Sequence, residues 1–368
     1  MAQVGAMQQV PVMRPKLPVA ARIAPFLHRI DETGIYSNFG PLARSLEGRL
    51  AAFFGLQIGC AITVANATLG LTLALSAQHP RPGSLCAIPA WTFAATAHAA
   101  TFAGLIPYFI DVDPDTWALD PNAIVDEISR APGFVSSVVP VVPFGCPIDV
   151  ASWDDVRTRT GLAVVIDAAA AFDSLIPGVV PSVVSLHATK VLGIGEGGCI
   201  VSVDTGLIKD LRARANFGFF GSREALVPAI NAKLSEYHAA IGLAALEEWA
   251  AVRAEWMQVA RAYGDAFAGS NRIGLQRGFG NTWVTSTCVL DIADAGAERV
   301  ERALAAAQIE TRRWWGQGAH AHPATAQLPR APVSVTEGLA RSTIGVPFYR
   351  DLDLATIQWI ADYVHAVA

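Results

Sequence analysis

Short apolar segments alternate with helical segments through the first half of the chain, and this alternation limits the possible folds more than any other feature. The segments are rich in Val, Ile and Ala, and stretches with apolar residues at helical spacing separate several of them. Strands joined by helices form a mostly parallel sheet covered on both faces, with ligands at the carboxyl ends of the strands. We therefore predict an α/β fold. The predicted strands are residues 61–64, 84–88, 106–111, 135–142 and 162–166, and the predicted helices are 42–54, 68–76 and 92–103.

The rest of the chain divides around one long helix. Residues 1–40 are predicted to form an extended N-terminal arm that ends in a substrate or dimer loop. Residues 235–268 have the pattern of a helix long enough to bridge two lobes. We expect a large domain at 41–250 and a smaller C-terminal α+β domain at 251–368. The smaller domain is predicted to hold a strand at 282–290 and helices at 296–306 and 354–367.

Composition excludes several classes of protein. The 368 residues carry 27 Lys and Arg against 32 Asp and Glu, a net charge of −5, so no nucleic-acid partner is expected. Prolines interrupt the longest uncharged run, between Arg81 and Asp111, so no membrane span is expected. The five cysteines are scattered and without metal-ligand spacing, which predicts no metal site. The first residues lack the layout of a signal peptide, and we expect a cytoplasmic protein.

Lys190 is the only formally charged side chain between Asp173 and Glu196. A lysine in such an apolar segment either extends to the surface or is held inside. Inside, loss of hydration lowers the pKa of the amine and makes it a nucleophile able to form a Schiff base. An exposed lysine at a loop tip is the ordinary alternative. The segment GIGEGG after Lys190 resembles a dinucleotide fingerprint, but it does not follow the first strand.

Asp167 follows the predicted strand 162–166 and is the only charge between Arg159 and Asp173. A buried carboxylate needs a cation to pair with it, and a protonated pyridine nitrogen would supply one. Capping of the next helix is the alternative. Together, Asp167 and Lys190 suggest pyridoxal phosphate, with the lysine on the aldehyde and the aspartate on the ring nitrogen.

Two further loops follow predicted strands. Asn66 and Thr68 stand at the start of a helix, where free N–H groups suit a phosphate, although both residue types are also ordinary N-caps. Phe93 follows the strand at 84–88 and could stack on a flat ring, with core packing as the alternative.

Taken in order, these segments resemble the DegT/StrS family of nucleotide-sugar aminotransferases, which have the type I pyridoxal-phosphate fold. The resemblance extends from about Tyr36 to the C-terminus. It is carried by the segments SNFGP (37–41), PAWTFAATAHAATFAG (89–104), PYFIDVDPDTWALDP (107–121), PFGCPID (143–149), VIDAAAAF (165–172), SLHATKVLGIGEGGCIV (185–201) and INAKLSEYHAAIGLAALE (230–247).

The resemblance implies roles for particular residues of this chain. Lys190 matches the Schiff-base lysine and proton shuttle, and Asp167 matches the partner of the ring nitrogen. Asn231 matches an asparagine that reaches the phosphate from a neighbouring subunit, which implies a homodimer with shared active sites. The remaining cofactor contacts implied are the stacking Phe93, the backbone donors of Thr68 and Leu69, and the hydroxyl of Ser185.

The chain departs from the family pattern at three places. Ala170 stands where the family has Gln or His near the phenolic oxygen of the cofactor. Asn66 and Ala67 replace the usual Ser-Gly, and Asp173 replaces a usual Gly. These changes bear on the tuning of the cofactor and on substrate fit. Relatives with His in place of the lysine are sugar dehydratases, so Lys190 favours transamination.

We expect a homodimeric enzyme that moves an amino group from glutamate to a keto sugar nucleotide, with a dTDP-4-keto-6-deoxyhexose as the favoured acceptor. The alternatives are a 3-keto-sugar or aminocyclitol aminotransferase, a sugar dehydratase or lyase, and a non-catalytic relative that binds the cofactor. Tyr36, Asn38 and His320 are the candidate substrate contacts, and Trp314, Trp315 and Arg312 could also meet the acceptor.

Overall fold

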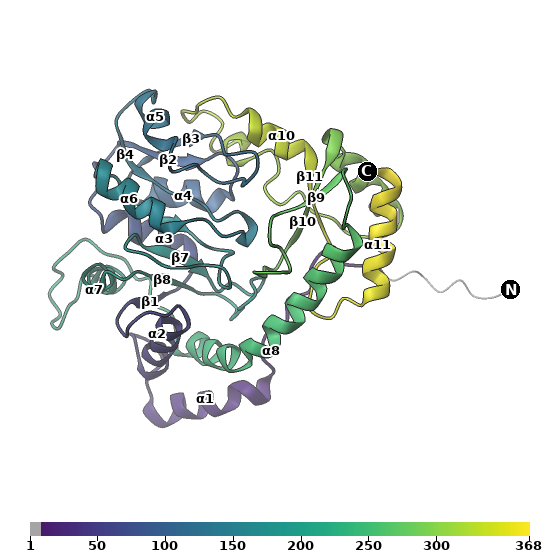
Figure 1. The fold of residues 1–368 in the computed structure, drawn as a ribbon. Helices are drawn as coiled ribbons and strands as arrows, with labels where there is room; N and C mark the ends of the chain where they lie inside the picture. Colours follow the sequence, from purple (N-terminus) through teal and green to yellow (C-terminus); the bar gives the residue numbers. More distant parts are fainter. Residues whose placement is uncertain (1–8) are drawn as a thin grey trace.

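A central mixed sheet forms the large part of the molecule (Figure 1). The computed structural model describes residues 9–368. Val141 and Asp167 form a parallel bridge that joins two four-stranded parts of this sheet. Its strand pairs are parallel except those made by β8, which is antiparallel to both neighbours, so the expected mostly parallel sheet is confirmed. The order is β3 (Ile106–Ile110), β2 (Leu85–Pro89), β4 (Val135–Val138), β5 (Ala163–Val164), then β6 (Ile166–Asp167), β7 (Ser182–Ser185), β8 (Gly198–Val201) and β1 (Ala61–Val64).

Helices cover this sheet along its whole width. α3 packs against β7 and β8, α4 packs against β2 and β3, and α2 and α7 pack against β1. The strands between them are buried on both faces, as the continuous apolar segments of the sequence predict. The helices are α2 (Pro41–Phe53), α3 (Ala67–Ser76), α4 (Ala94–Phe102), α5 (Ile124–Ser129), α6 (Val150–Thr160) and α7 (Thr205–Arg214).

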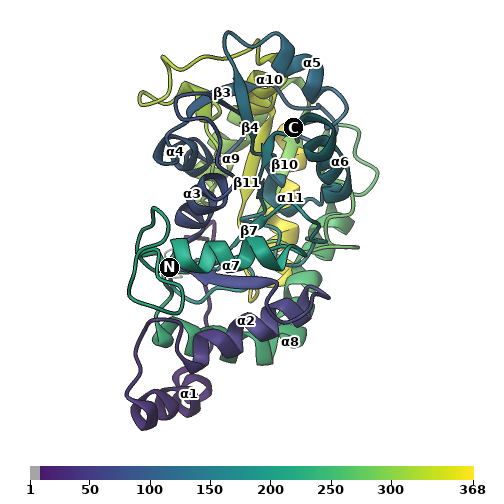
Figure 2. The same cartoon turned by 90° about the vertical axis from the view of Figure 1, so that its left-hand side faces the viewer.

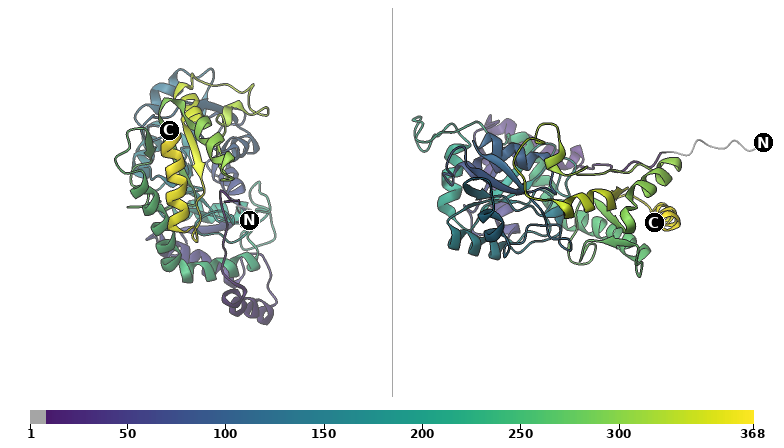
Figure 3. Two further views of the ribbon diagram at one scale, coloured as in Figure 1. Left: turned by 90° about the vertical axis from the view of Figure 1, so that its right-hand side faces the viewer. Right: turned by 90° about the horizontal axis from the view of Figure 1, so that it is seen from above.

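A second, smaller sheet lies at the far end of the long helix α8 (Glu236–Ala266) (Figure 1). It is antiparallel, with β10 (Cys288–Ile292) between β9 (Ile273–Leu275) and β11 (Thr343–Val346). Figure 3 shows α11 on the outer side of this part of the chain. The helices here are α9 (Ala297–Ala306), α10 (Ser334–Ser342) and α11 (Leu354–Val367).

The N-terminal region differs from the extended arm that the sequence predicts. Residues 1–8 lie outside the described part of the chain, and Val10 pairs with Ile309 of the small domain. α1 (Ala20–Thr33) then forms a helix, which Figures 1 and 2 both place at the end of the molecule, beyond α2. Only Phe26 and Ile30 of α1 are fully buried, so its apolar stripe is short and its helical pattern was missed.

Two predicted strands begin or end elsewhere. The strand expected at 135–142 ends at Val138, before Pro140, because proline has no N–H to donate to a ladder. The strand expected at 282–290 begins only at Cys288. Residues 282–287 instead form a loop that approaches the large domain. Val284 N–H donates to Asp173 Oδ2 at 2.9 Å in this loop.

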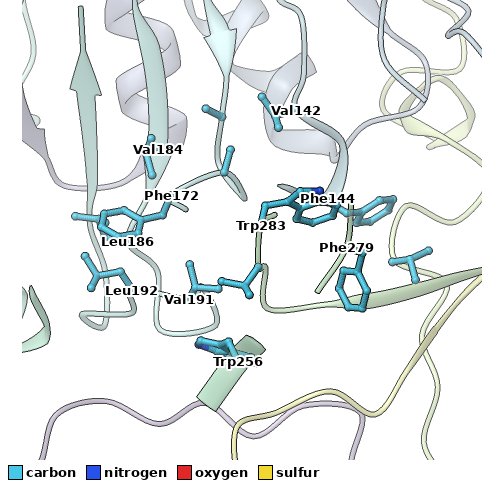
Figure 4. Packing of buried hydrophobic residues seen from close by; sticks show 14 of the residues in the cluster. Val142, Phe144, Phe172, Val184, Leu186, Val191, Leu192, Trp256, Phe279 and Trp283 are labelled. Atoms are coloured by element: carbon cyan, nitrogen blue, oxygen red, sulfur yellow. The ribbon is translucent and has the colours of Figure 1, made fainter. Parts of the chain in front are cut away.

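A layer of apolar side chains supports the loop that carries Lys190. Figure 4 shows Val191 and Leu192 between Leu186 and Trp256 of α8. All four of these side chains are buried. The lysine loop is therefore fixed from below by the long helix as well as by the ends of its own strands.

Asp173 joins three parts of the chain. Its buried carboxylate accepts two hydrogen bonds from Arg253 of α8, at 2.6 and 3.1 Å, and one from Val284 N–H. Its side chain is 3% exposed, so water cannot replace these donors. The aspartate that departs from the family pattern thus has a structural contact that explains it.

Replacing Arg253 with Ala should lower the free energy of unfolding by about 2–4 kcal/mol, because the Asp173 carboxylate would lose its cation while staying buried. Arg49→Ala is the matched control, since Arg49 pairs with Glu247 on the surface and should change stability by less than about 1 kcal/mol. Urea unfolding of both variants measures the difference. Equal losses would show that the Asp173 pair has no special structural weight.

Candidate active site

A cavity of about 480 Å³ lies where the carboxyl ends of β6 and β7 meet the small domain. Five of the residues predicted for the cofactor site line it together: Thr68, Phe93, Asp167, Ser185 and Lys190. They come from four separate connections that each follow a strand of the large sheet. The small domain closes the cavity with Ser286, Thr287, Arg312, Trp314 and Trp315.

Asp167 is the last residue of β6 and is 5% exposed. Its Oδ2 accepts a hydrogen bond from Thr96 Oγ1 at 2.8 Å, and its Oδ1 accepts one from Ala169 N–H at 3.1 Å. Burial raises the pKa of this carboxyl, and the two hydrogen bonds and the Lys190 charge oppose that rise. The carboxylate is therefore a buried base that a cation in the cavity would stabilise.

Lys190 stands in the tight loop between β7 and β8. Its backbone N–H donates to His187 O at 2.8 Å, and Ala188 N–H donates to Gly195 O at 2.7 Å. Gly195 has φ +103°, a conformation that favours glycine, which explains part of the glycine-rich segment. Burial lowers the pKa of the Lys190 amine, with the negative charge of Asp167 acting in the opposite direction. More of this amine is therefore the neutral nucleophile at neutral pH than for an exposed lysine.

The start of α3 forms the polar end of the cavity. The first turn of a helix has N–H groups without intrahelical acceptors, and Thr68 adds a hydroxyl. Ser185 Oγ accepts from His187 N–H at 3.2 Å, which leaves its own proton free to donate. The backbone N–H of Leu69 is occupied, because it donates to Asn66 Oδ1 at 2.9 Å. The structure thus makes Asn66 the N-cap of α3, and Leu69 does not line the cavity.

Aromatic side chains enclose the cavity on its small-domain side. Trp315 stacks on Phe144 with ring centroids 3.9 Å apart, and Trp91 meets Trp315 edge to face at 5.3 Å. Phe93 also lines the cavity but is 62% exposed, so it has room to move over a flat ring. The residue at the unusual family position, Ala170, lines the cavity without a polar side chain.

Sequence reasoning missed several polar residues that line the cavity. His187 Nδ1 accepts from Thr189 N–H at 3.2 Å, which places the ring proton on Nε2, 3.7 Å from Glu196 Oε1. Thr92 and Thr96 follow β2 one helical turn apart, and that spacing after a strand was the available signal for them. Ser286 and Thr287 gave no signal, because only the tertiary fold brings them to the cavity.

The other predicted residues lie outside this cavity of the chain. Tyr36 is exposed and stacks near Tyr237, with centroids 6.2 Å apart. Asn38 lines a separate cavity of about 510 Å³ beside Arg212. Asn231 is exposed and pairs with Asn216. His320 is buried and packs edge-on against the ring of Phe109, so it does not face the cavity.

Comparison with known proteins bears on these features directly. The family model described as the DegT/DnrJ/EryC1/StrS aminotransferase family matches residues 19–365. The chain belongs to this family. It is an aminotransferase with the fold of the pyridoxal-phosphate-dependent enzymes, as the sequence predicts. In residues 9–368, no group of potential metal ligands and no helix able to cross a membrane is present.

Three similar proteins show the range of substrates in the family. The solved structure of DesI in the presence of its TDP-sugar product has 30% identity and a TM-score of 0.87, covering 98% of this chain and 93% of that one. A dTDP-4-amino-4,6-dideoxy-D-glucose transaminase of Escherichia coli is 31% identical over 65% of this chain and 64% of its own length. A UDP-N-acetyl-3-dehydro-alpha-D-glucosamine 3-aminotransferase of Acidithiobacillus ferrooxidans is 29% identical over 91% and 90%.

The residues of the cavity fit the family cofactor, pyridoxal 5'-phosphate. Asp167 offers a buried carboxylate to a ring N–H, and Lys190 offers an amine of lowered pKa to an aldehyde. Thr68, Ser185 and the first turn of α3 offer donors to a phosphate. Each functional group of the cofactor therefore has a chemically matched partner in one cavity.

Replacing Lys190 with Met should make the stability of the cofactor-free protein less dependent on alkaline pH. The folded pKa of Lys190 lies below its ordinary value of 10.5, so the unfolded chain binds more protons between those two pH values. Raising the pH through that window therefore stabilises the wild type relative to Lys190→Met. Urea unfolding at pH 7 and pH 10 measures this difference.

The control for this experiment is Lys16→Met, because the Lys16 side chain is 56% exposed. Its stability should follow the wild-type dependence on pH. A constant difference between wild type and Lys190→Met at both pH values would contradict a buried amine at position 190.

Proposed function

We propose that this protein transfers an amino group from glutamate to the 4-keto group of a dTDP-linked 4-keto-6-deoxyhexose. The observation that supports it most is the meeting of Lys190 and Asp167 in one cavity beside the N-terminus of α3. The similarity to DesI with its TDP-sugar product and to the E. coli transaminase supports the choice of acceptor.

Pyridoxal phosphate, when bound, supplies an aldehyde that links covalently to amines and a ring that takes up electrons from the carbon being deprotonated. Thr68 and Ser185 would bind its phosphate, and Phe93 would lie over its ring. Asp167 would accept the ring N–H and hold a positive charge on that nitrogen. Lys190 would hold the aldehyde carbon.

The chain's own residues then manage the proton transfer. Once its Nζ is free, Lys190 takes the proton from Cα of the amino donor as a general base. The same Nζ, now protonated, delivers that proton as a general acid. Burial lowers the pKa of Lys190, which suits both tasks near neutral pH. The Phe144–Trp315 stack shields the cavity from water and so limits loss of the proton.

We also propose a cytoplasmic homodimer in which each active site receives residues from both subunits. Asn231 and Asn38 lie outside the cavity of their own chain, so a second copy is needed for them to reach a cofactor or sugar. The segment 217–230 near Asn231 exposes apolar side chains, as a subunit interface requires. They are Phe217, Phe220, Leu226 and Ile230. The five cysteines are free, in keeping with a reducing compartment.

A 3-keto sugar nucleotide is the second candidate acceptor, supported by the similarity to the A. ferrooxidans 3-aminotransferase over 91% of this chain. The division into residues 1–40, 41–250 and 251–368 is likewise proposed as the domain organisation. It places the α8 helix across the boundary between the large and small domains.

Incubation of the purified protein with pyridoxal phosphate, glutamate and a panel of keto sugar nucleotides tests the proposed reaction. We expect 2-oxoglutarate and an aminated sugar with the dTDP-4-keto-6-deoxyhexose, identified by mass spectrometry and NMR. Amination only of a UDP-3-keto sugar would favour the second acceptor. Loss of a hydroxyl without amination would indicate a dehydratase, and absence of glutamate turnover would contradict an aminotransferase.

Mixing two inactive variants tests the shared active site. Lys190→Ala and Asn231→Asp should each lack activity, the first through the missing amine and the second through a negative charge near the phosphate. Random exchange of subunits should restore about a quarter of wild-type activity, because half of the dimers would hold one intact site of two. Activity that stays at background after verified subunit exchange would contradict sharing.

A further inference from the structure

Two threonines at the start of α4 form a chain of hydrogen bonds that ends on Asp167. Thr92 Oγ1 lies 2.8 Å from Thr96 Oγ1, and Thr96 Oγ1 lies 2.8 Å from Asp167 Oδ2. Thr92 is 1% exposed and Thr96 is fully buried, so bulk water does not satisfy either hydroxyl. Thr92 also lines the cavity, which puts the outer end of the chain at the candidate active site.

The direction of each hydrogen bond follows from the ionised carboxylate. An ionised carboxylate only accepts, and a threonine hydroxyl has a single proton. The proton of Thr96 therefore goes to Asp167 Oδ2, and Thr96 Oγ1 must accept the proton of Thr92. This arrangement is fully satisfied only while Asp167 is ionised, because a proton on Oδ2 would face the proton of Thr96.

The other oxygen of Asp167 is oriented independently. Ala169 N–H donates to Oδ1 at 3.1 Å, so each carboxylate oxygen has one donor from the protein. Burial favours the neutral acid, and these two donors together with the charge of Lys190 are what oppose it. Thr96 supplies the only side-chain hydroxyl among these opposing groups, and it acts on the same carboxylate that faces the cavity.

We propose that Thr96, supported by Thr92, is a positioning residue that keeps Asp167 ionised and turned toward the ring nitrogen of bound pyridoxal phosphate. The proposal rests on the proposed function, since it assigns Asp167 to that nitrogen. It predicts that loss of the Thr96 hydroxyl weakens the contact between Asp167 and the ring N–H. It also predicts that contacts to the phosphate and the aldehyde are unaffected.

Cofactor binding by Thr96→Val, which keeps the shape of the side chain and removes its hydroxyl, tests this. The dissociation constant of pyridoxal phosphate should rise about 10- to 100-fold, the range for a lost hydrogen bond to a charged group. An analogue with carbon in place of the ring nitrogen should bind wild type and Thr96→Val equally. In turnover, kcat should fall while KM for glutamate changes little, and Thr96→Ser should restore both quantities.

The matched control is Thr101→Val on the same helix, because the Thr101 hydroxyl bonds only to Ala97 O. It should bind the cofactor as the wild type does. Thr92→Val removes the outer donor alone and should give a smaller loss in the same direction. Thr92→Val also tests the proposal if Thr96→Val does not fold.

Several outcomes would overturn the inference. Equal affinity of wild type and Thr96→Val for pyridoxal phosphate would show that Thr96 does not support the ring contact. An equal loss with the carbon analogue would show a general structural role in its place. Failure of the wild type itself to bind pyridoxal phosphate would contradict the proposed function, which separates that failure from a failure of the threonine proposal.

Discussion

The burial of one carboxylate and one amine in the same cavity is the constraint on which the rest of the structure depends. Loss of water disfavours the charged form of both Asp167 and Lys190, and the charge of each opposes that effect on the other. Neither group contributes usefully to an apolar core. Their cost is understandable if a ligand brings a cation to the aspartate and an electrophile to the lysine.

The fold supplies these two groups by a common device. Asp167 ends one strand of the sheet, Lys190 follows another, and the α3 N-terminus follows a third. The small domain then covers the cavity with aromatic side chains, and Asp173 and Arg253 fix α8 and the 282–287 loop to the large domain. The geometry of the site is therefore set by the ends of strands, while its enclosure is set by packing between domains.

The sequence predicted the parts that follow from local pattern. Buried strands and amphipathic helices have their own periodicity, so the sheet and the α8 helix were recognised, and lone charges in apolar segments pointed to Asp167 and Lys190. Local pattern carries no information on tertiary contacts. The sequence therefore did not show that Thr96 supports Asp167, that Asn66 occupies the Leu69 N–H, or that His320 packs against Phe109. α1 was missed because its buried stripe is short.

The most direct test of the central claim is reduction of the cofactor-bound protein with borohydride, followed by mass mapping of its peptides. The chain has four lysines, at positions 16, 190, 209 and 233. The account predicts a phosphopyridoxyl group on Lys190 alone. Lys233 is the informative competitor, since burial also lowers the pKa of its amine. A label on Lys233, or none on any lysine, would contradict the account.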